Sequence, residues 1–362
     1  MNQTIPLIPV TILTGFLGSG KTTLLNHILK ARHDYRIAVI ENEFGEVGID
    51  SEILLQERGE QIVQMNNGCI CCTVRGDLTR MLGELAHKRT SGELAFDRVV
   101  IETTGLADPA PVAQTFFAED EVVREYRLDG IVTMVDAVHG PHALDANRQA
   151  QKQVGFADRI ILTKTDLVTA GHAAALTQRL RRMNARAPVK AVEQGRVDAA
   201  DVLDLGGFDL ARALAVDADF LEPAAHQHHR HDEIASFVFR HAQALDLEKL
   251  ENLLGLLIER FGDDMLRYKG VLDVADREER IVFQGVHKML ASEPGTRWAA
   301  GEVRESVIVF IGRNLPRELF LKGLSLCAYG LAADPAEVLR DWSPPVSTGA
   351  GVVPTARRST RI

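Results

Sequence analysis

The sequence lacks the features that mark nucleic-acid-binding, membrane and secreted proteins. It has no net positive charge, because 41 lysines and arginines stand against 50 aspartates and glutamates, which gives −9 at pH 7. A nucleic-acid partner would require a basic face that replaces counterions, so we expect no nucleic acid among the partners. No apolar run is long enough to span a membrane, and no signal-peptide pattern is visible. We therefore expect a cytoplasmic protein that does not bind a membrane.

Cysteine is scarce, and its distribution is uneven. Only four cysteines occur in 362 residues, and three of them fall within Cys69 to Cys72. A structural disulfide framework requires more cysteines at wider spacing, whereas close clustering is typical of metal or redox chemistry. The hydrophobic content of 46% is that of an ordinary globular protein, and the length predicts two domains.

The stretch Gly15-Phe-Leu-Gly-Ser-Gly-Lys-Thr22 fits the pattern G-x-x-x-x-G-K-[ST] of a phosphate-binding P-loop. The apolar run from Leu7 to Leu13 predicts a buried strand before it, and leucines at helical spacing follow it. The glycines allow backbone N–H groups to surround a phosphate, and the helix dipole adds positive potential. We expect Lys21 to reach the β- and γ-phosphates and Thr22 to bind Mg²⁺. The predicted nucleotide-binding residues here are Gly15, Gly18, Ser19, Gly20, Lys21, Thr22 and Thr23.

A second motif, Glu102-Thr-Thr-Gly105, follows the predicted strand Asp97 to Ile101. An acid and then a glycine after an apolar strand resemble the second phosphate-sensing motif of P-loop NTPases. We expect Glu102 to hold Mg²⁺ directly or through water, and the backbone N–H of Gly105 to sense the γ-phosphate. Glu102 and Asp50 are the candidates for orienting the attacking water.

A third motif, Thr163-Lys-Thr-Asp166, ends the predicted strand Arg159 to Leu162. It is the Asn-Lys-x-Asp guanine-recognition motif of GTPases with threonine in the first position. The Asp166 carboxylate can accept from N1–H and from the 2-amino group of guanine, a donor pair that adenine lacks. Lys164 is expected to lie along the base, while Thr163 replaces the usual amide.

The thiol cluster in Gly68-Cys-Ile-Cys-Cys72 leaves three interpretations open. Three thiolates with a carboxylate or water would form a tetrahedral site that suits Zn²⁺, with Co²⁺ or Ni²⁺ less favoured by ligand softness. The thiols are also close enough to exchange as a redox pair, or they are small buried side chains. Metal binding is the interpretation that we favour.

Together with Glu41-Asn-Glu-Phe-Gly-Glu46, these motifs resemble the CobW-type metallochaperone GTPases of the SIMIBI class, in particular the YjiA-like branch. The resemblance implies Mg²⁺-dependent hydrolysis of GTP to GDP and phosphate, coupled to delivery of a transition metal to a client protein. It implies that the metal is usually zinc or cobalt and that Glu41, Glu46 and Cys71 are ligands, completed by Cys69 and Cys72. By analogy with the class, a nucleotide-dependent homodimer is expected. The alternatives are a GTP-modulated metal buffer and a thiol redox switch that gates the GTPase.

We expect an α/β fold in which a SIMIBI-type P-loop GTPase domain with a mostly parallel sheet spans residues 1–216. Residues 217–232 are predicted to form a linker containing His226, His228, His229 and His231, which either bind a second metal ion or are simply solvated. A smaller α+β domain over 233–332 resembles the CobW C-terminal domain, and 333–362 is predicted to be a flexible tail. Within the smaller domain we expect a strand, a helix and a closing helix, with further strands at Leu266–Val274, Arg280–Leu290 and Ser306–Gly312.

Overall fold

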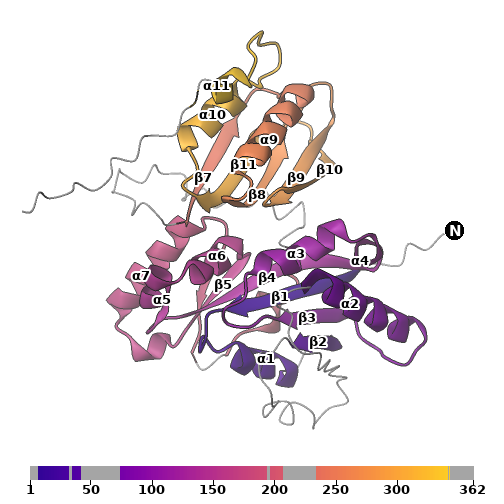
Figure 1. The fold of residues 1–362 in the computed structure, drawn as a ribbon, viewed down its shortest axis with the longest axis vertical. Helices are drawn as coiled ribbons and strands as arrows, with labels where there is room; N and C mark the ends of the chain where they lie inside the picture. Colours follow the sequence, from indigo (N-terminus) through magenta and orange to yellow (C-terminus); the bar gives the residue numbers. More distant parts are fainter. Residues whose placement is uncertain are drawn as a thin grey trace, which may run out of the picture.

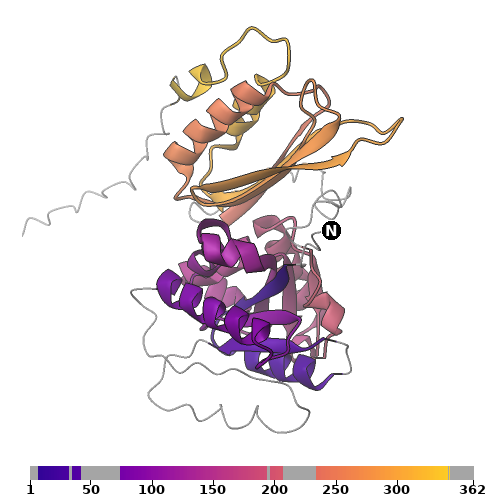
Figure 2. The same cartoon turned by 90° about the vertical axis from the view of Figure 1, so that its right-hand side faces the viewer.

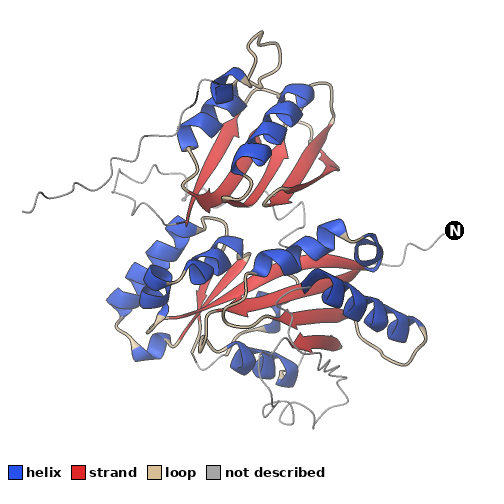
Figure 3. Ribbon diagram, viewed as in Figure 1, coloured by secondary structure: helices blue, strands red, loops and turns tan. Residues whose placement is uncertain are grey.

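The chain forms two sheets, each with its own helices (Figures 1 and 3). The computed structural model describes residues 7–31, 35–41, 74–193, 196–206, 234–340 and 342. Within these ranges no helix is long and apolar enough to cross a membrane. The α/β fold with a parallel GTPase-type sheet and a smaller α+β domain is confirmed.

The first sheet has six strands, and every neighbouring pair in it is parallel. Parallel strands need crossover connections, which is why helices cover both faces and the strands are almost continuously apolar. In the order β2-β3-β1-β4-β5-β6, the strands are β2 (Ile37–Glu41), β3 (Arg98–Glu102), β1 (Ile8–Gly15), β4 (Tyr126–Asp136), β5 (Arg159–Thr163) and β6 (Val189–Ala191).

Two hydrophobic clusters sandwich this sheet. One face packs against α1 (Lys21–Lys30) and the segment 196–206, which contains the short η2 (Ala199–Asp201). The larger cluster lies on the other face, where the helices are α2 (Val74–Thr90), α3 (Pro109–Ala118), α4 (Asp120–Glu125), α5 (Gly140–Ala146), α6 (Arg148–Phe156) and α7 (Ala170–Met183).

Parallel pairing also places the carboxyl ends of β1, β3, β4 and β5 at the same edge of the sheet. Each of these ends leads directly into one of the predicted motifs or into Asp136. Ligands of open parallel sheets bind outside the carboxyl ends of the strands. The fold therefore brings motifs that are far apart in the sequence to one edge.

The second sheet is antiparallel, in the order β10-β9-β8-β11-β7. One of its faces is covered by helices, as Figure 2 shows, and a separate core of leucines and phenylalanines fills the space between. The elements are β7 (Ile234–His241), α9 (Leu247–Phe261), β8 (Met265–Leu272), β9 (Glu279–Val286), β10 (Met289–Arg297), β11 (Ser306–Arg313), α10 (Arg317–Ser325) and α11 (Glu337–Arg340).

Two details of this domain differ from the sequence prediction. The single strand predicted over Arg280–Leu290 is wrong, because a two-residue turn after Val286 divides it into the antiparallel pair β9 and β10. The turn places His287 at φ 52°, a conformation that usually requires glycine or asparagine, so the sequence carries no turn signal there. In addition, packed structure continues beyond 332, since Arg260 on α9 donates to the carbonyls of Leu339 and Trp342.

The two domains share part of one hydrophobic cluster, which includes Phe156 on α6 and Leu266 on β8. At Gly155 an added Cβ would lie 2.8 Å from the side chain of Leu266, so a larger residue would force Leu266 to shift. Arg267 crosses the same boundary. Its guanidinium donates to the Phe156 carbonyl at 2.8 Å and to the Asp158 carboxylate at 2.6 Å.

We predict that Arg267→Ala lowers the free energy of unfolding by about 3 kcal/mol, because it leaves the Asp158 carboxylate buried without its cation. The Asp158 side chain is only 9% exposed and that of Arg267 only 6%. Calorimetric unfolding of the full chain measures the effect. The matched control is Arg240→Ala, which removes an ion pair with Glu305 whose partners are each 33% exposed, and which should cost less than about 1 kcal/mol. Similar losses in the two variants would contradict the prediction.

Candidate functional site

The P-loop has a backbone conformation that requires glycine at two positions. Gly20, the residue before α1, lies at φ 94°, and Gly15 lies at φ 144°. A Cβ at Gly15 would be 2.5 Å from the Met134 carbonyl oxygen, so β4 leaves no space for a side chain. The loop is thus built into the sheet edge, with the first turn of α1 behind it, in the arrangement that binds phosphate.

Lys21 lies folded against this loop. Its Nζ donates to the carbonyl oxygen of Gly15 at 2.9 Å, and the residue is buried. Burial lowers the pKa of the Lys21 ammonium below its usual value, while the nearby Glu102 carboxylate acts in the opposite direction. The contact to Gly15 holds the ammonium at the centre of the loop, where phosphate oxygens would bind.

Thr22 and Glu102 meet beside the P-loop. The Thr22 hydroxyl donates to Glu102 Oε1 at 3.3 Å, although the two residues are 80 positions apart. A hydroxyl and a carboxylate are hard oxygen ligands of the kind that Mg²⁺ binds, with phosphate oxygens and water completing its octahedral shell. The donor set therefore fits Mg²⁺, as the sequence predicted for these two residues.

The loop after β3 packs directly against the P-loop. At Gly105 an added Cβ would lie 2.7 Å from the backbone nitrogen of Leu17, so this position has room only for glycine. The contact places the predicted γ-phosphate sensor beside the phosphate-binding loop. Residues 103–108 thus form a second wall of the site.

Thr163 connects the predicted guanine motif to the P-loop. Its hydroxyl donates to the Ser19 carbonyl at 2.9 Å, and the side chain is buried. The threonine in the first position of the motif therefore supplies a donor that fixes the loop. Asp166 lies on the exposed turn η1 (Thr165–Leu167), where its carboxylate is accessible.

Lys164 is held by an acid that the sequence analysis did not assign to the site. It lies at φ 57°, and its Nζ donates to Asp136 Oδ2 at 2.7 Å. Asp136 ends β4, and its Oδ1 accepts from the backbone N–H groups of Val138 and His139. Burial alone would raise the pKa of Asp136, but the hydrogen bonds from Lys164, from the His139 ring and from these N–H groups outweigh it and hold the pKa below its usual value.

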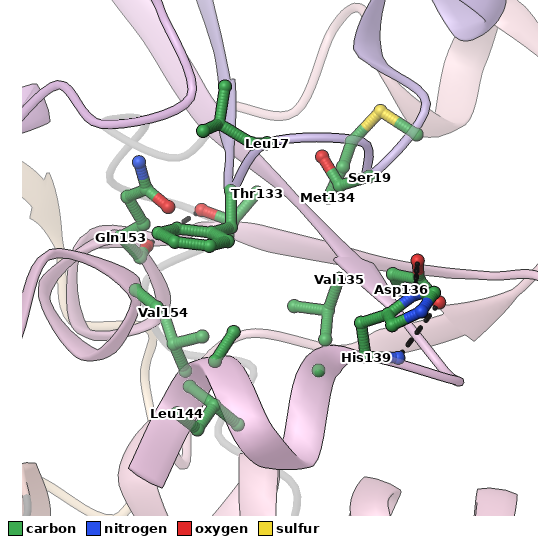
Figure 4. A pocket seen from close by; sticks show the side chains of 14 residues that line it. Leu17, Ser19, Thr133, Met134, Val135, Asp136, His139, Leu144, Gln153 and Val154 are labelled. Atoms are coloured by element: carbon green, nitrogen blue, oxygen red, sulfur yellow. Dashed lines mark hydrogen bonds and ion pairs between the residues drawn. The ribbon is translucent and has the colours of Figure 1, made fainter. Parts of the chain in front are cut away.

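A cavity lies behind the P-loop, between the end of β4 and helices α5 and α6 (Figure 4). It encloses about 350 Å³ of unfilled space, part of which is open to solvent. Leu17 and Ser19 form one wall, and Leu144 and Val154 lie across from them, with Asp136 and His139 together to one side. Among the described residues that line this cavity there is no lysine or arginine, whereas Lys21 is held against the P-loop at the Gly15 carbonyl.

Much of the predicted cargo-metal site lies outside the described residues, so its geometry stays a prediction. Among the residues that the structure does describe, no group of three or more His, Cys, Asp or Glu side chains could hold a metal ion. Of Glu41 only the backbone is described, at the end of β2. The other predicted residues outside the described ranges are Glu46, Asp50, Cys69, Cys71, Cys72, His226, His228, His229 and His231.

Glu41 nevertheless has a defined backbone position. In the parallel ladder between β2 and β3, Glu41 pairs with Glu102, and these two residues end their strands together. The first predicted ligand of the cargo metal and the predicted Mg²⁺ acid therefore occupy neighbouring positions at one sheet edge.

The sequence matches two family models that together cover both domains. Residues 9–191 match the CobW/HypB/UreG nucleotide-binding domain, and residues 234–328 match the cobalamin synthesis protein CobW C-terminal domain. The chain belongs to the CobW family. The family predicted from the order of the sequence motifs is therefore confirmed.

Two relatives with similar sequences align over most of their length. The chain is 43% identical to the zinc chaperone YjiA of Escherichia coli over 86% of this chain and 96% of that protein. It is 35% identical to the zinc chaperone CobW of Pseudomonas aeruginosa, over 86% and 89% of the two chains. Against the crystal structure of Zn(II)-bound YjiA GTPase from E. coli the TM-score is 0.69, at 36% identity, covering 88% of this chain and 98% of that one.

We predict that Thr163→Val weakens the binding of both GDP and GTP about tenfold, because a buried carbonyl left without its donor costs on the order of 1–3 kcal/mol. Titration with a fluorescent guanine nucleotide measures this effect. Thr163→Ser, which keeps the hydroxyl, should bind nearly as tightly as the unmodified protein.

Thr115→Val is the matched control for this prediction, since the buried Thr115 hydroxyl donates within α3 to the Pro111 carbonyl. It should leave nucleotide affinity unchanged. An unchanged affinity in Thr163→Val would show that the hydroxyl does not fix the loop.

Proposed function

We propose that this chain couples the hydrolysis of GTP to GDP and phosphate to the binding and delivery of a transition metal. Its relatives are named zinc chaperones and a zinc-regulated GTPase metalloprotein activator, and the solved relative is a Zn(II)-bound GTPase. The chain is accordingly a metal-binding GTPase of the CobW family, with Mg²⁺ as cofactor and zinc as the metal. The proposal adds which residues act and how the two functions are connected.

The P-loop and its neighbours supply electrostatic stabilisation for phosphoryl transfer. Water attacks the γ-phosphorus, the bond to the β–γ bridging oxygen breaks, and GDP and phosphate leave. Charge that develops on the transferred group meets the N–H groups of the loop and the Lys21 ammonium, which the structure holds in place. Mg²⁺, held by Thr22 and Glu102, would neutralise further charge on the phosphates. Glu102 and Asp50 remain the candidates for orienting the attacking water.

We assign guanine specificity to the motif Thr163–Asp166, which begins at the last residue of β5. The Asp166 carboxylate would accept from N1–H and the 2-amino group, with Lys164 along the base. The fixed position of Lys164, in contact with Asp136, supports this assignment because a long flexible side chain then loses little further freedom on binding.

The observation that carries the coupling is the register that pairs Glu41 with Glu102. Segment 42–73, which starts at this point, contains all three clustered cysteines and the predicted ligand Glu46. When the γ-phosphate and Mg²⁺ bind or leave, a rearrangement at Glu102 would therefore occur next to Glu41, the first proposed ligand of the cargo metal. We propose that GTP favours the metal-holding state and that hydrolysis releases the ion.

The client protein and the oligomeric state are proposals as well. The metal would pass to a client protein, and a nucleotide-dependent homodimer is proposed by analogy with the SIMIBI class. Thiolates at Cys69, Cys71 and Cys72 favour Zn²⁺ over Co²⁺ or Ni²⁺ on ligand softness. The proposed compartment is the cytoplasm, where these thiols stay reduced.

We predict that zinc affinity depends on the bound nucleotide. In chelator competition, a non-hydrolysable GTP analogue should change zinc affinity about tenfold relative to GDP, a coupling of about 1.4 kcal/mol, and the effect should vanish in Cys71→Ser. By linkage, zinc must then shift the nucleotide affinity ratio by the same factor.

The control for this experiment is Cys327→Ala, because Cys327 is buried in the C-terminal domain and lies far along the chain from the cluster. It should keep the full nucleotide effect. Equal zinc affinity in both nucleotide states would favour a metal buffer without delivery. Absence of zinc binding would indicate that the thiols are redox groups.

We predict that Asp166→Asn weakens GTP binding about 100-fold or more, since each hydrogen bond to a charged group contributes about 1.5–3 kcal/mol. The amide should at the same time improve binding of xanthosine triphosphate, whose C2 carbonyl accepts where guanine donates. Competition between the two nucleotides measures the change. Asp145→Asn, which alters an exposed acid on α5, is the control and should preserve the preference for guanine. An unaltered preference in Asp166→Asn would remove this residue from the base site.

A further inference from the structure

Gln153 is a buried amide on α6 whose side chain reaches out of its own helix. Its Nε2 donates to the carbonyl oxygens of Gly105 at 3.2 Å and Ala107 at 3.0 Å, and the residue is 1% exposed. Both acceptors lie in the loop between β3 and α3 that carries the proposed γ-phosphate sensor. Figure 4 shows Gln153 on the same side of the cavity as Thr133.

The backbone of α6 is itself held in place at this point. The Thr133 hydroxyl on β4 donates to the Gln153 carbonyl at 2.7 Å. In the residues that follow, the buried amide of Asn184 donates to the carbonyls of Val154, Gly155 and Ala157, which caps the end of the helix. The Gln153 amide is therefore presented from a fixed support.

The same helix also holds the far end of the sensor loop. Lys152 Nζ donates to Asp108 Oδ2 at 2.6 Å, and Asp108 Oδ1 accepts from the Ala110 N–H as the N-cap of α3. At its near end Gly105 packs against the P-loop at Leu17. The loop is thus positioned between the P-loop on one side and consecutive side chains of α6 on the other.

We propose that Gln153 is a positioning residue for GTP hydrolysis: by holding the carbonyls of Gly105 and Ala107 it fixes the loop at Gly105, so that the N–H of this residue is directed at the γ-phosphate. The inference rests on the proposed function, because it takes Gly105 to contact that phosphate. If the loop were free, GTP binding would have to order it at a cost in conformational entropy. The two hydrogen bonds from Gln153 order the loop when the protein folds, so this cost does not weaken GTP binding. GDP has no γ-phosphate and does not use this N–H, so the benefit belongs to GTP alone.

The test is Gln153→Met in the full-length protein, which keeps the length and volume of the side chain and removes both donors. Affinity for a non-hydrolysable GTP analogue with Mg²⁺ should fall about tenfold, as expected for the loss of two hydrogen bonds, while GDP affinity stays within about twofold. The turnover number should fall, since the same N–H stabilises the transferring phosphate. If Gln153→Met does not fold, Gln153→Asn serves instead, because its amide is one methylene too short to reach both carbonyls.

The matched control is Gln151→Met, two residues earlier on the same helix. Gln151 is also buried, and its Nε2 donates to the Leu144 carbonyl on α5 at 2.9 Å, away from the sensor loop. It should lower stability by a similar amount and leave the ratio of GTP-analogue to GDP affinity unchanged. A ratio that changes in Gln153→Met and not in Gln151→Met supports the inference.

Equal ratios in Gln153→Met and the unmodified protein, or equal loss of both nucleotides, would overturn the inference and leave the GTPase proposal intact. An unmodified protein that bound neither guanine nucleotide would overturn both. The two failures are therefore distinguishable in one set of titrations.

Discussion

Parallel pairing of every strand in the first sheet determines where the chemistry of this protein lies. Because parallel strands all end at the same edge, the P-loop, the Glu102 loop, Asp136 and Thr163 come together although they span about 150 positions of the sequence. Direct hydrogen bonds then join them, including Thr163 to the Ser19 carbonyl and Thr22 to Glu102. The parts of the candidate nucleotide site are consequently connected to one another by direct contacts.

This connectivity has a consequence for how a metal cargo is controlled. Glu41 and Glu102 end adjacent strands, so the proposed cargo ligand shares its sheet edge with the proposed Mg²⁺ acid. The γ-phosphate that distinguishes GTP from GDP adds negative charge near this edge, which would attract a cation held nearby, and more strongly where water is excluded. The identity of the nucleotide can therefore influence the cargo metal without a large rearrangement of the domain.

Local sequence spacing indicated the P-loop and the Glu102–Gly105 motif, because each consists of residues that lie within a few positions of one another. The parallel GTPase fold was predicted from the family resemblance that the ordered motifs carry, and it is confirmed. Contacts across long sequence separations carry no such signal. Gln153 reaches Gly105 over 48 positions, and Lys164 meets Asp136 over 28. The turn at His287 was missed for a different reason: the residue adopts a positive φ without being glycine or asparagine. The predicted site residues within 42–73 and 217–232 lie outside the described structure.

Helix α6 touches the sensor loop through Gln153 near its middle and the C-terminal domain through Phe156 at its end. Because Gly155 has no side chain, the Leu266 side chain packs directly against the helix backbone. A short helix is stiff along its axis, and both contacts are made to its backbone or to buried groups. Helix α6 is therefore the shared support of two otherwise separate contacts, and a substitution that displaces it would disturb the sensor loop and the domain boundary together.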